Sequence, residues 1–260
     1  MKHLKTAIIA AAVGAALAPA AQAQLSANIG AVSNYMWRGV TQTDDGPAIQ
    51  GGVDYGYEGF FVGAWASNVK FIGTQETTVL SPSATPGDPP VETVITSDVD
   101  HDASVEVDLY AGYGGSIDDF SYKGGVYFYT YPGGGDVDFV ELGVSGAYQV
   151  TKEVSLGLAF NYTVNGEAKN DLPFNQGDYY IQANANFTLP MDFGLGITYG
   201  FYEFNDANVS YPWAGASLTK TAGDFGTFGL NVSQAWGDVN AITLSGPEDL
   251  KVWVSWLKTF

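Results

Sequence analysis

Cysteine is absent from the 260-residue chain, and histidine occurs only twice. Without cysteine there is no disulfide framework and no thiolate metal site. Basic residues are scarce as well, because 10 Lys and Arg stand against 28 Asp and Glu, for a net charge of −18. A net negative charge of this size argues against nucleic acid as a partner, since binding to phosphates needs basic patches.

Long apolar runs are equally rare, and the one present lies at the N-terminus. A basic start at residues 2–5 precedes an apolar run at residues 7–18, and Ala21-Gln22-Ala23 supplies the small residues that a signal peptidase requires. This layout is typical of a secretory signal peptide and is too short for a spanning helix. We expect residues 1–23 to be a cleaved signal peptide and residues 24–260 to form one domain. A retained N-terminal anchor is the alternative.

Glycine and aromatic residues are abundant instead, with 33 Gly, 16 Tyr, 15 Phe and 6 Trp. After the signal peptide, runs of about ten residues alternate apolar with polar side chains between turn signals, as in strands that cross a membrane. In the clearest run, Val105, Val107 and Leu109 alternate with Glu106 and Asp108. A period of two is typical of a strand with one apolar and one polar face. In an exported chain, this pattern favours a β-barrel.

The connections between these runs alternate in length. Those near residues 58, 117, 152, 191 and 223 are short, whereas those near 45, 72–101, 133, 170, 210 and 242 are mostly longer. Bacterial outer-membrane barrels combine short periplasmic turns with longer external loops. We therefore predict an all-β fold, a transmembrane antiparallel up-and-down β-barrel of about 12 strands with both termini in the periplasm. Ten and fourteen strands remain alternatives.

Residues 72–101 interrupt the alternation. They contain four prolines and many Ser, Thr and Asp residues. Proline removes backbone donors, and lipid tolerates no unpaired backbone groups. We expect a long external loop at 72–101, with at most a short hairpin at residues 91–96.

The polar faces of the strands supply the candidate functional residues. A basic side chain that faces lipid costs about 2–4 kcal/mol near the midplane, so these charges are predicted to point inward. The candidates for lining the pore are Arg38, Asp54, Lys70, Glu106, Asp108, Lys123, Glu141 and Lys251. The alternative is that they fill the lumen with salt bridges, because a narrow barrel can be packed shut.

The apolar faces are predicted to meet lipid. On the first strand this face includes Tyr35 and Trp37, which would lie toward the outer leaflet, where aromatic rings prefer the interface. On the third strand, predicted over residues 60–71, Phe61 and Trp65 share the apolar face.

The first predicted hairpin also carries a family resemblance. Residues 33–42 read Ser-Asn-Tyr-Met-Trp-Arg-Gly-Val-Thr-Gln, and residues 47–55 read Pro-Ala-Ile-Gln-Gly-Gly-Val-Asp-Tyr. This stretch resembles the opening signature of the TorF-type porins, also called the Gcw_chp family. The resemblance implies a bacterial outer-membrane barrel and leaves the solute open.

Enzymatic chemistry has little support in the sequence. The mature chain has a single histidine, His101, and a nucleophilic Ser would need that base within hydrogen-bond reach. We expect a solvated loop histidine and no enzyme. A barrel hydrolase ranks third among the hypotheses for the function of the chain. No cofactor is expected.

Three aspartates beside this histidine have the spacing of a calcium loop. They are Asp98, Asp100 and Asp102, but Ala103 stands where an EF-hand needs Gly, and Leu109 where it needs Glu. A weak divalent-cation site is the alternative to an acidic, hydrated loop.

The end of the chain resembles a barrel assembly signal. Trp256 and Phe260 share the apolar face of the last predicted strand, although Lys258 departs from the usual pattern. The resemblance implies that the outer-membrane barrel assembly machinery recognises this end.

Together these features lead to an expected function. We expect a monomer in outer-membrane lipid that acts as a passive channel for small polar or charged solutes, with a weak cation preference from its acidic loops. A closed barrel with a structural or surface-recognition role is the alternative.

Overall fold

The structure is a computed structural model of the chain. It describes residues 23–70, 72–81, 91–100, 103–134, 137–166, 174–205, 208–237 and 249–260, and within 72–81 and 91–100 it describes the backbone. Predictions about residues 1–22, His101 and Asp102 lie outside the described residues. In the described part, no helix has the length and apolar character needed to cross a membrane.

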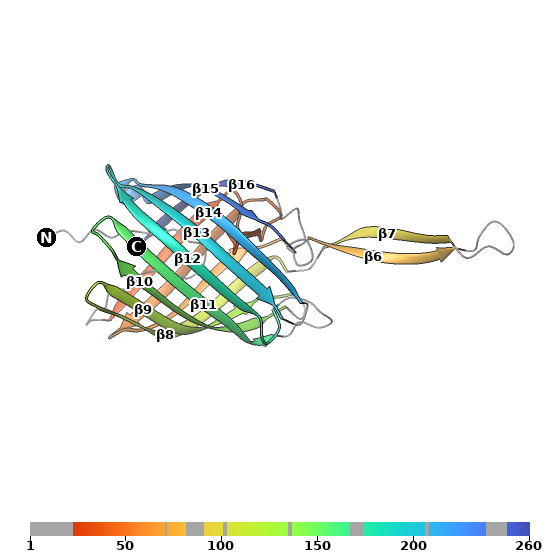
Figure 1. The fold of residues 1–260 in the computed structure, drawn as a ribbon, viewed down its shortest axis with the longest axis horizontal. Helices are drawn as coiled ribbons and strands as arrows, with labels where there is room; N and C mark the ends of the chain where they lie inside the picture. Colours follow the sequence, from red (N-terminus) through yellow and green to blue (C-terminus); the bar gives the residue numbers. More distant parts are fainter. Residues whose placement is uncertain are drawn as a thin grey trace.

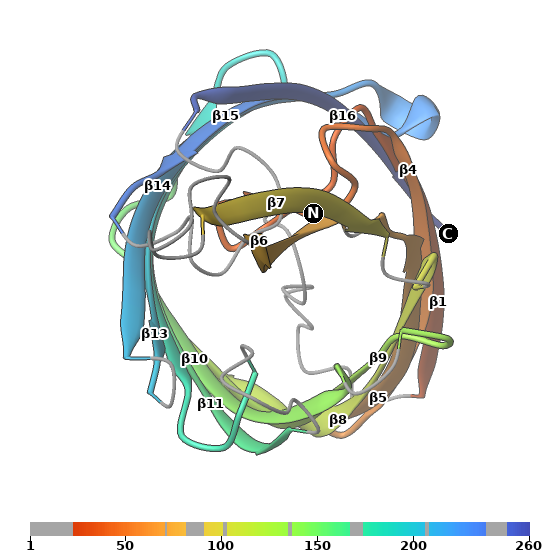
Figure 2. The ribbon, with the colours of Figure 1, turned by 90° about the vertical axis from the view of Figure 1, so that its right-hand side faces the viewer.

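Twelve antiparallel strands form a closed barrel (Figures 1 and 2). The first strand pairs with the last, from Asn28 opposite Thr259 to Val32 opposite Ser255, so the barrel has no free edge. The predicted strand number and barrel class are therefore confirmed. The barrel strands are β1 (Gln24–Val32), β4 (Ala48–Tyr57), β5 (Phe60–Asn68), β8 (Val105–Ile117), β9 (Phe120–Thr130), β10 (Phe139–Gln149), β11 (Val154–Gly166), β12 (Tyr179–Leu189), β13 (Phe193–Phe204), β14 (Val209–Thr221), β15 (Thr227–Ala235) and β16 (Lys251–Thr259).

The barrel wall is apolar outside and polar inside. On β8, Leu109 is 51% exposed, whereas Glu106 and Asp108 are buried on the inner face. On β11, Leu158 and Phe160 point outward in the same way. This arrangement inverts the usual rule for a water-soluble core, so the outer surface suits lipid.

The orientation of β5 differs from the prediction. Phe61 is buried and Trp65 is partly buried on the inner face, whereas Val62 is 51% exposed. Room for the Phe61 ring comes from Gly112, since a Cβ there would lie 2.4 Å from its Cζ atom. The neighbouring glycine therefore accommodates the inward-facing ring of Phe61.

Turns at one end of the barrel are short, as predicted. Glu58 and Gly59 form the turn between β4 and β5 with positive φ angles of 49° and 88°. The connection after β13 is shorter than predicted, because β14 begins at Val209 and continues through Pro212. This proline pairs with β13 just before the pairing of β14 with β15 starts, so the ladder loses no bond there.

The long segment between β5 and β8 contains two further strands. β6 (Ile72–Ser81) and β7 (Val91–Asp100) pair along their whole length, from Ile72 opposite Asp100 to Ser81 opposite Val91. This hairpin projects from the end of the barrel opposite to the C-terminus (Figure 1). The prediction of at most a short hairpin was wrong, because two ten-residue strands satisfy each other's backbone without the barrel.

The first predicted hairpin is also different in the structure. β1 ends at Val32 and β4 begins at Ala48, and residues 33–47 turn into the barrel. We call residues 33–47 the inward segment. It contains β2 (Met36–Trp37), which pairs with β3 (Val40–Thr41). Tyr35 and Trp37 are 3% and 4% exposed, so the prediction that they face lipid was wrong.

Candidate functional site

The inward segment is held in shape by short polar side chains. Asn34 donates to the Asp45 carboxylate at 2.7 Å and accepts from the Thr41 hydroxyl at 2.7 Å. These bonds join the two halves of the segment. At its tip, Arg38 and Gly39 both have positive φ, 48° and 86°. That combination is required by the tightest hairpin turn, and it carries Arg38 to the far side of the lumen.

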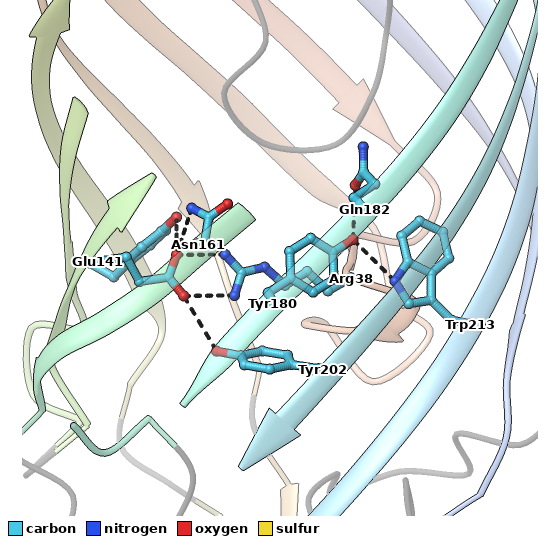
Figure 3. A network of polar contacts seen from close by, with 8 residues as sticks. Arg38, Glu141, Asn161, Tyr180, Gln182, Tyr202 and Trp213 are labelled. Atoms are coloured by element: carbon cyan, nitrogen blue, oxygen red, sulfur yellow. Dashed lines mark hydrogen bonds and ion pairs between the residues drawn. The ribbon is translucent and has the colours of Figure 1, made fainter. Parts of the chain in front are cut away.

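Arg38 and Glu141 form a bidentate ion pair across the lumen (Figure 3). The two guanidinium nitrogens lie 2.7 and 2.5 Å from the two carboxylate oxygens. Asn161 donates to the same carboxylate at 3.0 Å. The Arg38 and Glu141 side chains are 7% and 0% exposed. A paired geometry of this kind is among the strongest that a carboxylate makes.

Aromatic rings surround the guanidinium on its faces. Its central carbon lies 4.2 Å from the ring centres of Trp37 and Tyr180 and 4.8 Å from that of Tyr202. Cation–π attraction at such distances adds to the ion pair when water is excluded. Tyr180 is fixed in turn, because Trp213 donates to its hydroxyl at 3.2 Å (Figure 3).

Burial and neighbouring charge shift the pKa of Arg38 in opposite directions. Burial lowers the pKa of its guanidinium, whereas the Glu141 carboxylate, together with Tyr202 and Tyr129, raises it, and the net pKa lies well above its usual value. Arg38 therefore keeps its positive charge at any pH at which the protein is folded.

Trp37 anchors the tip of the inward segment in a cluster of rings. Its ring centre lies between 5.8 and 6.3 Å from those of Tyr129, Phe139, Phe174 and Tyr202. Most of these contacts are edge-to-face, the arrangement that aromatic pairs prefer. The tip is therefore bound to the wall by apolar packing as well as by charge.

Two lysines tie the base of the inward segment to the barrel. Lys251 on β16 reaches the Asp45 carboxylate at 2.6 Å and is 9% exposed. Lys70 reaches Asp44 at 2.9 Å, with its side chain 56% exposed. Lys70 lies beyond the end of β5 rather than on its polar face, because the strand stops at Asn68.

Glu106 and Asp108 form a second buried acidic group, on β8. They are 1% and 3% exposed. Tyr35 of the inward segment donates to one oxygen of Glu106 at 3.4 Å. The other oxygen of Glu106 and one of Asp108 have no hydrogen-bond partner among the described residues. These carboxyl groups interact directly with each other and lack a basic partner in the described lumen.

Asp54 and Lys123 lie nearer the short-turn end. Tyr110 donates to Asp54 at 2.7 Å, and the Lys123 ammonium lies 4.2 Å from the centre of the Phe61 ring. Both side chains are partly exposed. Neither takes part in the contacts around Arg38.

The remaining candidates lie at the chain end and in the long hairpin. On β16, the Trp256 indole donates to the Phe225 carbonyl at 2.8 Å, and Phe260 is 68% exposed. Asp98 and Asp100 lie on β7, and their side chains are outside the described part. Among the residues that are described, no group of three His, Cys, Asp or Glu side chains could hold a metal ion.

Sequence reasoning identified the charges but missed the aromatic residues around them. Tyr180 and Tyr202 were not singled out. A signal was present in β9, where Tyr127 and Tyr129 occupy positions that alternate with the lipid-facing Phe128. Aromatic residues on both faces of one strand indicate rings inside the lumen as well as outside.

The fold is that of outer-membrane porins. The structure is similar to one described as "KdgM porin", with a TM-score of 0.57 and 11% identity over 90% of this chain and 99% of that one. It is also similar to the NanC porin, with a TM-score of 0.52 and 11% identity over 91% and 98% of the two chains. A third is the COG4313 outer membrane channel from Pseudomonas putida F1, with a TM-score of 0.51 and 10% identity over 91% and 95%.

The family is established by sequence. The model of the family described as "Bacterial protein of unknown function (Gcw_chp)" matches residues 16–251, so the chain belongs to the Gcw_chp family. The match confirms the resemblance of residues 33–55 to the Gcw_chp family. Comparison with curated proteins finds no match.

Proposed function

We propose that the chain is an outer-membrane channel for the passive diffusion of small polar or charged solutes. The observation that carries this proposal is the closed barrel with an apolar exterior and a polar inner face. On that inner face Asn231 donates to Ser255 at 3.0 Å and accepts from Ser217 at 2.6 Å. A polar lumen of this kind is typical of barrels that conduct water-soluble molecules.

The charges of the lumen favour a weak preference for cations. Glu141 is neutralised by Arg38, and Lys251 by Asp45. Among the predicted pore-lining residues of the barrel strands, this leaves Asp54, Glu106 and Asp108 against Lys123. The solute of one similar structure is oligogalacturonate, an acidic sugar polymer. An excess of carboxylates in the lumen of this chain suits a positively charged solute better than an acidic one.

Location and assembly belong to the same proposal. The signal peptide at residues 1–23 would export the chain, and the barrel assembly machinery would recognise Trp256 and Phe260. We propose a monomer, with residues 72–101 outside the cell and no catalytic role. The hydrolase hypothesis rests on His101, and the sequence pattern identifies no nucleophilic serine to pair with this base.

A closed structural or surface-recognition barrel is the second candidate. The observation that favours it is the inward segment, whose residues 34–40 are buried inside the barrel. A planar-bilayer experiment on the folded full-length chain distinguishes the two functions. The chain is first shown to be folded by its heat-modifiable migration on a gel.

The reversal potential across a salt gradient is the measurement that tests the channel. We expect a weak cation preference that fades as salt rises, because charges are screened within about 8–10 Å at physiological ionic strength. A strong anion preference would contradict the charge assignment. Folded protein without any conductance would favour the closed barrel.

A further inference from the structure

We propose that Glu141, Asn161, Tyr180 and Tyr202 form a guanidinium-binding site in the barrel wall, and that the chain fills this site with its own Arg38. The inward segment then acts as an internal ligand that narrows the lumen, and a free guanidinium compound can take the place of the Arg38 side chain. The binding site stands by itself, whereas its effect on the lumen rests on the proposed channel function.

The site belongs to the wall and is built without the inward segment. Its residues lie on the consecutive strands β10, β11, β12 and β13 (Figure 3). Asn161 is directly opposite Tyr180 in the sheet, and Tyr180 is directly opposite Tyr202. Cross-strand neighbours of this kind are positioned by the backbone ladder itself. The sheet therefore presents one carboxylate, one amide and two rings in a row.

Contacts within the wall hold these side chains in place. Asn161 donates to Glu141, and the Tyr202 hydroxyl lies 3.5 Å from the same carboxylate. Tyr180 donates to Gln182 at 2.8 Å and accepts from Trp213 at 3.2 Å. A site whose side chains are already oriented pays little to bind its ligand.

The chemistry of the site selects a planar cation. Two carboxylate oxygens match two parallel N–H donors of a guanidinium, and an ammonium ion cannot reproduce that fork. The flanking rings favour a cation stacked between them. The Arg38 guanidinium satisfies both conditions, with bonds of 2.7 and 2.5 Å and with the ring centres of Tyr180 and Tyr202 at 4.2 and 4.8 Å.

The inward segment is attached so that its tip can leave while its base stays. The lysine contacts involve Asp44 and Asp45, at the base. The tip, at residues 36–41, is held by Arg38, by the packing of Trp37, and by the Tyr211 hydroxyl, which donates to the Arg38 carbonyl at 3.1 Å. Arg38 thus supplies the charged contact of the tip, and its loss weakens the attachment of the tip while the base keeps both lysine contacts.

Chemical rescue tests the proposal. The full chain with Arg38→Ala is folded in detergent and titrated with ethylguanidinium in a calorimeter, with N-ethylurea as the uncharged isostere. We expect ethylguanidinium to bind to Arg38→Ala and N-ethylurea not to bind. Adding Glu141→Gln should weaken binding by roughly tenfold or more, because the paired carboxylate bonds are lost. The wild-type chain should bind less tightly than Arg38→Ala, since its own side chain competes.

Conductance gives the second readout. Arg38→Ala should conduct more than the wild type, and ethylguanidinium should return its conductance toward the wild-type level. Lys123→Ala removes a lumen cation outside the site and should gain no ethylguanidinium binding. Folded Arg38→Ala that does not bind, or that binds equally well with Glu141→Gln, overturns the proposal.

Four further outcomes are decisive. If Arg38→Ala folds only when ethylguanidinium is present, the rescue itself supports the site. If it folds under neither condition, the wall is not preformed, and the proposal is overturned. Binding without any change in conductance would support the site and contradict its effect on the lumen, whereas binding by folded protein that conducts under no condition would contradict the channel, so the two failures are distinguishable.

Discussion

Gly39 provides the sharpest test of how the inward segment is seated. It occupies the turn beside Arg38 with φ of 86°. A Cβ atom at this position would lie 2.5 Å from Cγ of Trp213 and 2.6 Å from its Cβ. Trp213 cannot easily retreat, because its indole nitrogen is bonded to Tyr180, and the indole packs closely over Gly200. Gly39→Ala therefore forces the turn and the wall apart.

The magnitude follows from two separate costs. The left-handed backbone costs an alanine about 1–2 kcal/mol. Overpacking against a side chain that cannot move costs typically about 1–3 kcal/mol. Together they destabilise the seated position of the segment by roughly 2–5 kcal/mol. Because the wall is held by backbone ladders on both sides, we expect the segment to move and the barrel to stay folded.

Trypsin cleavage and conductance are the measurements. Arg38 is buried in the wild-type chain and is therefore protected from trypsin. In Gly39→Ala, we expect cleavage after Arg38, detected by the mass of the N-terminal fragment, together with a higher conductance. Heat-modifiable migration on a gel shows that the barrel is intact.

A matched glycine supplies the control. Gly223 also has positive φ, 55°, but a Cβ there would meet nothing within 4 Å. Gly223→Ala therefore carries the backbone cost alone and lies in the turn between β14 and β15. It should keep wild-type protection and conductance. If the two variants behave alike, the contact with Trp213 does not seat the segment, and our reasoning is refuted.

Three other predictions concern the barrel itself. Leu158→Arg on the outer face should destabilise the barrel in lipid vesicles by about 2–4 kcal/mol, as measured by urea unfolding. Ala159→Arg on the inner face should destabilise it less, and equal effects would contradict the assigned faces. Glu106→Gln should stabilise the protein by about 1–3 kcal/mol in thermal unfolding, because it removes charge from an oxygen that has no hydrogen-bond partner among the described residues, while the bond from Tyr35 is kept. A lower melting temperature would speak against this. Deletion of Phe260 should reduce folded protein in outer-membrane fractions, and unchanged levels would remove its role in assembly.

Much of the barrel was predictable because the pattern that encodes a strand is local. The alternation around Leu109 and Leu158 shows which side chains share a face, whatever the neighbouring strands are. Turn chemistry such as Glu58-Gly59 is equally local, since it depends on backbone angles at two residues. Strand number and the positions of the short turns follow from these two signals.

Local pattern could not predict where a strand leaves the wall. Alternation continues from Ile29 through Tyr35 to Trp37, yet pairing with β4 stops at Val32. The same limit applies to β5, where Phe61 faces inward because Gly112 on the adjacent strand leaves room for its ring. Both outcomes depend on contacts with distant parts of the chain, and the alternation carries no information about them.

The sequence by itself determined that the chain has an apolar and a polar side, about twelve strands and a set of inward charges. Only the tertiary structure decided how these charges pair. Arg38 and Glu141 are 103 residues apart in the chain, and closure of the barrel brings β10 opposite the turn that carries Arg38. The physical reason is that an ion pair depends on distances across the lumen, and those distances are set by the register of all the strands that lie between.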